Sequence, residues 1–253
     1  SALLLPAGCA IQPLERLPRS VIPAPQPAQP VRAPAVGQAW TYEKYNFYNS
    51  EHLAIEREEV VALTPRIVVQ RQTDSGVPLG DEHHAQWGRI VRDPVWDAIL
   101  NYENPVDHWP ESLQVGAISA VSTRYWLDGG SFRYWVNVQT SARAWERVKV
   151  PAGTFDALRV EKIIRLQHPD ISRLHTVRRD TLWLAPEVGR WVARETNGEY
   201  RVSGARGGTG REDRPSRRPE TGRPPARFQR RLRRRCAPAG RSARRRLRDG
   251  WRA

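Results

Sequence analysis

The chain has 253 residues, of which 39% are hydrophobic, 21 are proline and 18 are glycine. Its formal net charge of +14 lies in one region, because residues 206–253 hold 18 arginines and four acidic residues while residues 1–205 carry no net charge. A charge confined to one end gives no argument that the rest of the chain binds nucleic acid. The only two cysteines, Cys9 and Cys236, lie outside the central region, which excludes a disulfide framework or a cysteine metal site there.

The first nine residues are typical of the end of a bacterial lipoprotein signal. A short apolar run, Leu3 to Leu5, is followed by small residues and then by Cys9. The segment 1–9 is interpreted as a truncated signal remnant, with Cys9 as the lipidated (palmitate-carrying) residue. Pro6 departs from the pattern, since an aliphatic residue is usual three places before the cysteine. The alternative is an ordinary N-terminus that contains a cysteine.

A proline-rich segment follows at 10–35. Residues 1–35 contain eight prolines, and such sequences favour extended polyproline conformations of about 3.1 Å per residue. The segment predicts a tether between a membrane and a domain. No run approaches the roughly 18 apolar residues that a spanning helix needs, so attachment to a membrane would come through lipid.

Residues 36–203 predict a single all-β, mainly antiparallel domain. Alternation at 132–139 and at 158–166 has the period of half-buried strands, and about nine to eleven strands are expected. The predicted fold is a curved meander sheet or a partly open β-barrel or sandwich, with at most one or two short helices. The best helix candidate runs from Asp93 to Tyr102.

Turn sequences divide these strands. Asp128-Gly129 and Asn197-Gly198 are dipeptides favoured in hairpin turns. Pro151 and Gly153 predict one hairpin corner and Pro186 and Gly189 another, because proline presets φ and glycine accepts the left-handed conformation. These four residues are assigned structural roles.

Two glycine-led starts, Val36-Gly37 and Val115-Gly116, lie 79 residues apart. They suggest an internal duplication into two related meanders, with chance similarity as the alternative.

Three motifs carry a family resemblance: an opening V-G-Q-A-W-T-Y at 36–42, a P-A-G-T-F turn at 151–155, and a W-x-x-P-x-x-G turn at 183–189. Over about residues 36–203 the chain resembles bacterial exported proteins of the DUF3108-like and TapB-like kind. The resemblance implies an envelope β-sheet protein of unknown function and provides no catalytic residue.

The densest group of potential metal ligands is Asp81-Glu82-His83-His84. Adjacent histidines of a strand point to opposite faces, so both could bind one ion only from a loop, and a solvated acidic turn is the default interpretation. Other acidic residues interleaved with arginine are interpreted as cross-strand pairs on the strand surface. No motif indicates a catalytic residue, a cofactor or a metal, and the prediction is that the protein is not an enzyme.

Eight tryptophans favour either an aromatic core or a groove that accepts an acyl chain. They are Trp87, Trp96, Trp109, Trp126, Trp135, Trp145, Trp183 and Trp191.

The arginine-rich tail, 204–253, predicts a disordered segment. It is interpreted as a frameshift artefact, as an anion-binding arm or as a solvated appendage.

The sequence as a whole predicts a lipoprotein held at a membrane by Cys9, facing the periplasm and placed in the outer membrane. Its β domain would bind or scaffold an envelope protein. The alternatives are a carrier of an apolar or acyl ligand and a protein that binds nucleic acid or an anionic surface through its tail. Binding of nucleic acid is disfavoured by the neutral central region.

Overall fold

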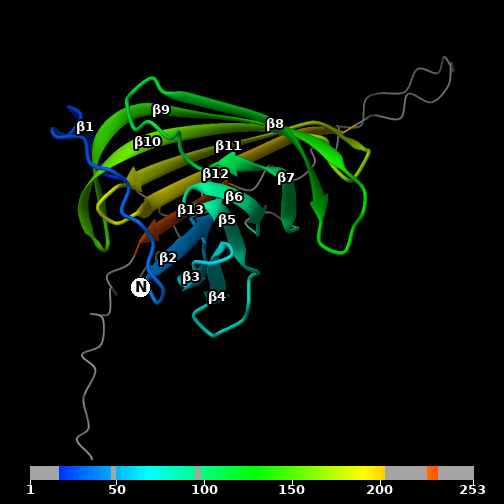
Figure 1. Cartoon of the computed structure of the whole chain (residues 1–253), viewed down its shortest axis with the longest axis horizontal. Coiled ribbons are helices and arrows are strands. Elements are labelled where there is room, and N and C mark those ends of the chain that lie inside the picture. Colours follow the sequence, from blue (N-terminus) through cyan, green and yellow to red (C-terminus); the bar gives the residue numbers. More distant parts are fainter. Residues whose placement is uncertain (1–16, 47–49, 95–97, 203–226, 233–253) are drawn as a thin grey trace, which may run out of the picture.

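The structure is a computed structural model that describes residues 17–46, 50–94, 98–202 and 227–232 (Figure 1). The described residues form thirteen strands and no helix. The strands are β1 (Arg19–Ile22), β2 (Ala39–Asn46), β3 (His52–Ala62), β4 (Ile67–Thr73), β5 (Glu82–Gln86), β6 (Arg89–Asp93), β7 (Leu100–Asp107), β8 (Ile118–Leu127), β9 (Tyr134–Val150), β10 (Gly153–Leu166), β11 (Arg173–Ala185), β12 (Arg190–Val202) and β13 (Arg227–Leu232). The prediction of an all-β antiparallel fold is confirmed.

The sheet is a curved meander. From β2 to β12 each strand pairs with its neighbour in sequence, and β13 lies between β12 and β2. The long strands β9 to β12 arch over the shorter strands β2 to β7 (Figure 1). Eleven strands therefore come from residues 36–203, as the turn signals predict. No helix in the described residues has the length and apolar character needed to cross a bilayer.

The suggested duplication is supported by the strand registers. Gly37 and Gly116 both have positive φ, and their N–H groups donate to Val60 O (2.8 Å) and Ala142 O (2.9 Å). In the first half, Ala39 of β2 pairs with Glu59 of β3. In the second half, Ile118 of β8 pairs with Ser141 of β9, and these residues lie 79 and 82 positions later in the sequence. Strands β2 to β6 thus match β8 to β12, one for one.

The irregularities match as well. The pairing of β3 with β4 shifts register after Val60, and the pairing of β9 with β10 shifts after Ala142, its counterpart. A β-bulge is a defined structural feature rather than random noise, so its recurrence strengthens the relation between the two halves. The sixth strand of each half pairs with the first strand of the other: β7 pairs with β8, and β13 with β2.

The interior contains two apolar clusters. The larger includes Trp183, Trp191 and Leu158, and the smaller includes Ile90, Tyr125 and residues of β9 and β10. Burial of such side chains is the main driving force for folding.

The structure corrects several predictions. The region of the proposed helix, Asp93 to Tyr102, consists of the end of β6 and the start of β7, with 95–97 outside the described residues. Asn197-Gly198 is not a turn, because both residues continue β12 opposite Arg179 and Arg178. Strand pairing on both sides overrides the turn preference of this dipeptide.

The predicted tether also differs from the structure. Leu17 is buried in the larger cluster, β1 pairs with β9, and the N–H of Arg32 donates to Pro186 O (2.9 Å). Residues 17–35 therefore lie along the domain, since their apolar side chains find partners there. Cys9 lies outside the described residues. Of the tail 204–253 the structure describes only β13, a strand where the sequence predicts none.

Candidate functional site

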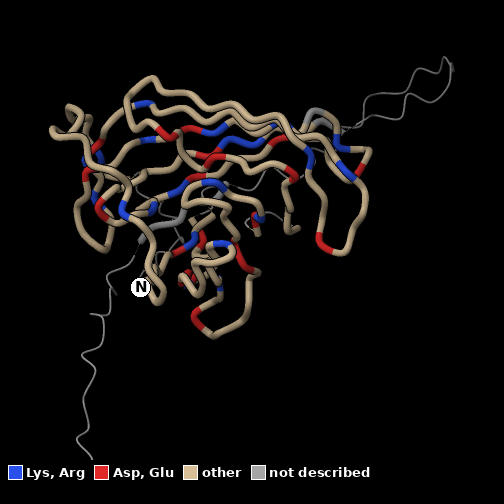
Figure 2. The backbone as a smooth tube through the Cα atoms, viewed as in Figure 1, with Lys and Arg blue, Asp and Glu red and all other residues tan. Residues whose placement is uncertain are grey.

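A layer of charged side chains separates the two apolar clusters. Along β10 the inward positions run Leu158, Val160, Lys162, Ile164 and Leu166, so that one lysine interrupts an apolar row. Buried charged residues of both signs continue this layer on other strands, and Figure 2 shows basic and acidic positions along the backbone of the domain. A charge in the interior is costly unless it is paired, so the partners decide what this layer does.

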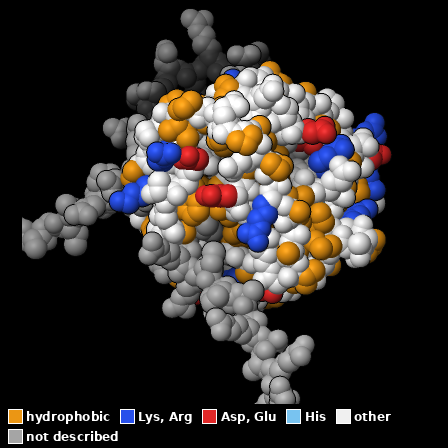
Figure 3. All heavy atoms as spheres, turned by 60° about the vertical axis from the view of Figure 1, so that its left-hand side comes forward, with side chains coloured by type: hydrophobic (Ala, Val, Ile, Leu, Met, Phe, Trp, Pro, Cys, Tyr) orange, Lys and Arg blue, Asp and Glu red, His pale blue; other side chains and the backbone are white. Residues whose placement is uncertain are grey.

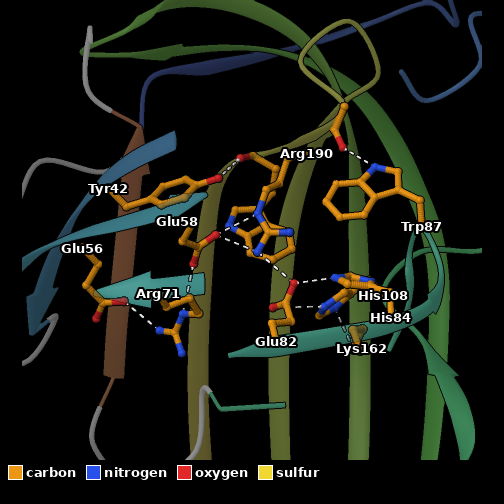
Figure 4. Close-up of polar contacts among 12 residues, drawn as sticks. Tyr42, Glu56, Glu58, Arg71, Glu82, His84, Trp87, His108, Lys162 and Arg190 are labelled. Carbon is orange, nitrogen blue, oxygen red and sulfur yellow. Dashed lines mark hydrogen bonds and ion pairs between the residues drawn. The ribbon is translucent and has the colours of Figure 1, made fainter. Parts of the chain in front are cut away.

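Arg190, the first residue of β12, is at the centre of the layer (Figure 4). Its Nε donates to Glu58 Oε2 at 2.8 Å, and its Nη2 donates to Glu82 Oε1 at 3.0 Å. All three side chains have zero exposure. Burial opposes the charge, but the carboxylates of Glu58 and Glu82 outweigh it and raise the pKa of Arg190.

Three tryptophans surround the guanidinium of Arg190. Its Cζ lies 3.7 Å from the ring centroid of Trp191, 5.2 Å from that of Trp40 and 5.6 Å from that of Trp87. The indole of Trp87 donates to Gly189 O at 2.7 Å, which ties the β5–β6 turn to the β11–β12 turn. The site is therefore an aromatic cage already filled by a side chain of the protein.

The layer extends from Arg190 towards β2. Glu58 also accepts from Arg71 Nε at 3.3 Å, and Arg71 Nη2 donates to Glu56 at 2.8 Å. Lys44 Nζ lies 3.3 Å from Glu56. Glu56 and Glu58 share the inward face of β3, so strand alternation places both carboxylates beside Arg71 of β4.

Two buried histidines flank Glu82. His84 Nε2 lies 2.7 Å from Glu82 Oε1, and His108 Nε2 lies 3.7 Å from the other carboxylate oxygen. Burial, with Lys162 nearby, lowers the pKa of His108 to about 3, so its ring is neutral at neutral pH. Burial also lowers the pKa of Lys162 to about 8. Although burial would raise it, the pKa of Glu82 is held well below its usual value, chiefly by Arg190.

A second group of charges lies on β11 and β12. Asp180 accepts from Arg178 Nε at 2.7 Å and from Arg194 Nη2 at 2.5 Å. Burial opposes ionisation, yet these two arginines lower the pKa of Asp180, and they also lower that of buried Asp93. Lys162 connects the two groups, because its Nζ lies 3.4 Å from His108 Nδ1 and its charge is stabilised by Asp180.

The two halves differ in the sign of the charges that they bury. Among the described residues of 36–114, five buried acids accompany one buried arginine; among those of 115–202, four buried bases accompany two buried acids. The residues of the first half are Glu43, Glu56, Glu58, Glu82, Asp93 and Arg71, and those of the second are Lys162, Arg178, Arg190, Arg194, Glu146 and Asp180. Each half supplies counter-ions for the other.

The structure corrects the interpretation of 81–84. Glu82 and His84 lie on the inward face of β5 with no exposure, while His83 points the other way and is partly exposed. The segment is a strand and not a solvated turn, because Arg190 pairs with Glu82. In the described part of the chain, no three His, Cys, Asp or Glu side chains are grouped to hold a metal ion.

The predicted turn residues lie at hairpin corners. Pro151 and Ala152 connect β9 to β10, and Gly153 has φ of +147°. Gly189 has φ of +79° and its N–H donates to Ala185 O at 3.0 Å. A Cβ on Gly189 would lie 2.6 Å from Arg32 O, so this glycine also makes room for the N-terminal segment.

Most of the described tryptophans pack in the core. Trp109, Trp145, Trp183 and Trp191 are buried, whereas Trp135 is half exposed. Trp96 lies outside the described residues. The majority of these rings are therefore used for packing, which leaves few of them to line a groove.

The sequence interpretation missed the charged layer. The signal was present in β10, where Lys162 falls on the same parity as Val160 and Ile164, and in β3, where Glu56 and Glu58 precede Val60 on one parity. A charge in an otherwise apolar inward row indicates a buried ion pair. The partners of these charges could not be found in this way, because the ion pair of Arg190 on β12 with Glu58 on β3 depends on how the sheet curves.

No family model matches the sequence, and no curated protein matches it. Two solved structures are similar in fold. One is a candidate lipoprotein from Parabacteroides distasonis, with 16% identity over 82% of this chain and 98% of that chain and a TM-score of 0.47. The other is a candidate exported protein with a YmcC-like fold from Bacteroides fragilis, with 14% identity over 67% of this chain and 92% of that chain and a TM-score of 0.45. At these identities no residue role is transferred to this chain.

Proposed function

We propose that the chain is a cell-envelope lipoprotein whose β domain binds or positions another envelope component without catalysing a reaction. The observation that carries the non-catalytic part is the state of the charged layer. Its acids and bases are buried and paired, with Arg190 of the second half joined to Glu58 and Glu82 of the first. Groups engaged in this way stabilise a fixed shape, which suits a binding or scaffolding domain.

The N-terminal segment supports attachment close to a membrane. Leu17 is buried in the core and β1 pairs with β9, and Cys9 precedes Leu17 by eight positions. A chain of that length reaches at most about 26–29 Å when fully extended. A lipid on Cys9 would therefore hold the domain near the bilayer surface, facing the periplasm.

The surface is consistent with protein contacts. On the face shown in Figure 3, acidic and basic side chains lie near one another among apolar ones and are not gathered in a large patch of one sign. A mixed face of this kind does not favour contact with a highly charged polymer there.

Labelling with radioactive palmitate in a bacterial host tests the proposal. We expect label on the wild-type chain, loss of label with Cys9→Ser and retention with the matched control Cys236→Ser. An unlabelled wild-type chain would refute the lipid anchor.

Chemical crosslinking in intact cells should then give one discrete adduct with an envelope protein, and that adduct should persist when Arg133→Ala changes an exposed charge. Absence of any adduct would count against a scaffolding role.

A further inference from the structure

The two seams between the halves are closed in different ways. At one seam β7 lies between β6 and β8, and at the other β13 lies between β12 and β2. The connection from β6 to β7 is six residues, 94–99, whereas that from β12 to β13 is 24 residues, 203–226. The two strands are counterparts in the duplication, but only β7 is bound closely to its own half by the chain.

The connection to β13 is much longer than its span. Arg227 pairs with Asn197, five residues before the end of β12 at Val202. A rise of about 3.3 Å per residue makes that gap about 17 Å, whereas 24 residues can extend to about 80 Å. A hairpin loop of two to five residues would require β13 to pair with β12 of the same copy. A connection of 24 residues carries no such requirement.

The site that β13 occupies recognises main chain on both sides. Residues 227–231 pair with 193–197 of β12, and residues 228–232 pair with 42–46 of β2. Both neighbours would be unpaired edges without it, and unpaired edges readily accept a strand from another chain. The strand shown to fit has the sequence Arg-Phe-Gln-Arg-Arg-Leu, and a second copy of the chain carries the same strand.

We propose that the seam between β2 and β12 is a strand-exchange site, in which Arg227–Leu232 of one copy inserts into a second copy. Reciprocal insertion gives a closed two-fold dimer that reproduces every strand pair of the monomer. The exchange costs no contacts, because the inserted strand is identical. This inference goes beyond the proposed envelope role and is independent of lipidation at Cys9.

Cysteine crosslinking of the full chain tests the exchange. In a background with Cys9→Ser and Cys236→Ser, Thr196→Cys is placed in one copy and Phe228→Cys in a second copy with a larger tag. These two positions pair in register, and opposed antiparallel residues have Cα distances of about 4.5–5.5 Å, suitable for a disulfide. After co-refolding and mild oxidation we expect a disulfide-linked product of both tags that thiol reductant reverses. A disulfide formed only within a copy carrying both cysteines, with no mixed product, would overturn the proposal.

A matched pair of variants shows whether the main chain of β13 makes the dimer. Gln229→Pro removes an N–H group and is poorly tolerated in a strand paired on both sides, whereas Gln229→Ala keeps the N–H. By native mass spectrometry over a range of concentrations, we expect dimer for Gln229→Ala and at least a tenfold lower dimer fraction for Gln229→Pro. Equal dimer fractions in two folded variants would overturn the proposal. If Gln229→Pro does not fold, the crosslink measured in the Gln229→Ala background decides.

Discussion

The two halves of the domain have the same strands but different interiors. Strands β2 to β6 and β8 to β12 share their registers, their bulge and their glycine-led starts. At matching positions, however, Asp93 of β6 corresponds to Arg194 of β12. The first half buries mostly acids and the second mostly bases. Backbone geometry has thus been kept while the buried charges have become complementary.

Complementary buried charges explain how a duplicated β domain can be held in one arrangement. A buried charge without its partner costs several kcal/mol, so the acidic half is stable only beside the basic half. Two acidic halves or two basic halves would leave buried like charges together. The charge layer therefore specifies which half pairs with which, whereas the apolar clusters on either side of it supply most of the stabilisation.

The strongest test of this complementarity removes Arg190. We expect Arg190→Met to lower the free energy of unfolding by about 3–5 kcal/mol, because Glu58 and Glu82 are left buried without their main counter-ion. The matched control is Arg89→Met, at the corresponding position of the first half. Arg89 is half exposed and pairs with Asp107 at 3.3 Å, so its loss should cost about 0–1 kcal/mol. Urea unfolding followed by tryptophan fluorescence measures both.

Rescue separates charge from volume. Adding Glu58→Gln and Glu82→Gln to Arg190→Met removes the two carboxylates that have lost this counter-ion, and we expect it to restore part of the stability. Equal losses for Arg190→Met and Arg89→Met would show that the layer does not hold the halves together.

Above the usual pKa of Asp and Glu, acid sensitivity should come from the first half, which contains the buried His108. Burial lowers the pKa of His108 to about 3, whereas a histidine of the unfolded chain titrates near 6.5. Between these values the unfolded chain binds a proton that the folded chain does not. Stability should therefore fall as the pH is lowered from about 6.5 towards 3, by at most about 1.4 kcal/mol per pH unit for this residue.

His108→Asn removes the imidazole that binds a proton in the unfolded chain. We expect the difference between urea midpoints at pH 6.5 and pH 4.5 to be smaller in the variant than in the wild type. This range stays above the usual pKa of Asp and Glu, so the carboxylates contribute less to the comparison. An unchanged difference would contradict a neutral buried His108.

Arg71 on β4 and Lys162 on β10 occupy corresponding inward positions. Substitutions at these two positions therefore compare the halves directly. Arg71→Met takes a donor from both Glu56 and Glu58, so we expect a loss of about 2 kcal/mol. Lys162→Met should cost less than about 1 kcal/mol, because Asp180 keeps Arg178 and Arg194. Chemical unfolding at pH 7 gives the free energy of unfolding of both variants. A larger loss for Lys162→Met than for Arg71→Met would contradict this prediction.

The sequence predicts the fold better than the site. Period-two alternation and the turns at Gly153 and Gly189 are local signals, and they correctly predict strands in the regions of β9 and β10 and the hairpin corners beside them. Local signals fail where tertiary pairing overrides them, as at Asn197-Gly198 within β12. The charged layer depends on contacts such as Arg190 with Glu58, separated by 132 residues. Such partners are set by sheet curvature, which no short stretch of sequence specifies.

The last comparison concerns the corresponding turn glycines, Gly88 and Gly189. Both have positive φ, of +88° and +79°, so alanine should cost about 1–2 kcal/mol at either position. The neighbours differ: a Cβ at Gly88 would lie 2.6 Å from the Trp109 ring, and one at Gly189 would lie 2.6 Å from the main-chain oxygen of Arg32. Only Gly189→Ala should therefore displace the N-terminal segment. We expect faster proteolytic cleavage within residues 23–35 in Gly189→Ala than in Gly88→Ala at matched stability, and equal cleavage rates would mean that the segment is held elsewhere, through β1 and Leu17.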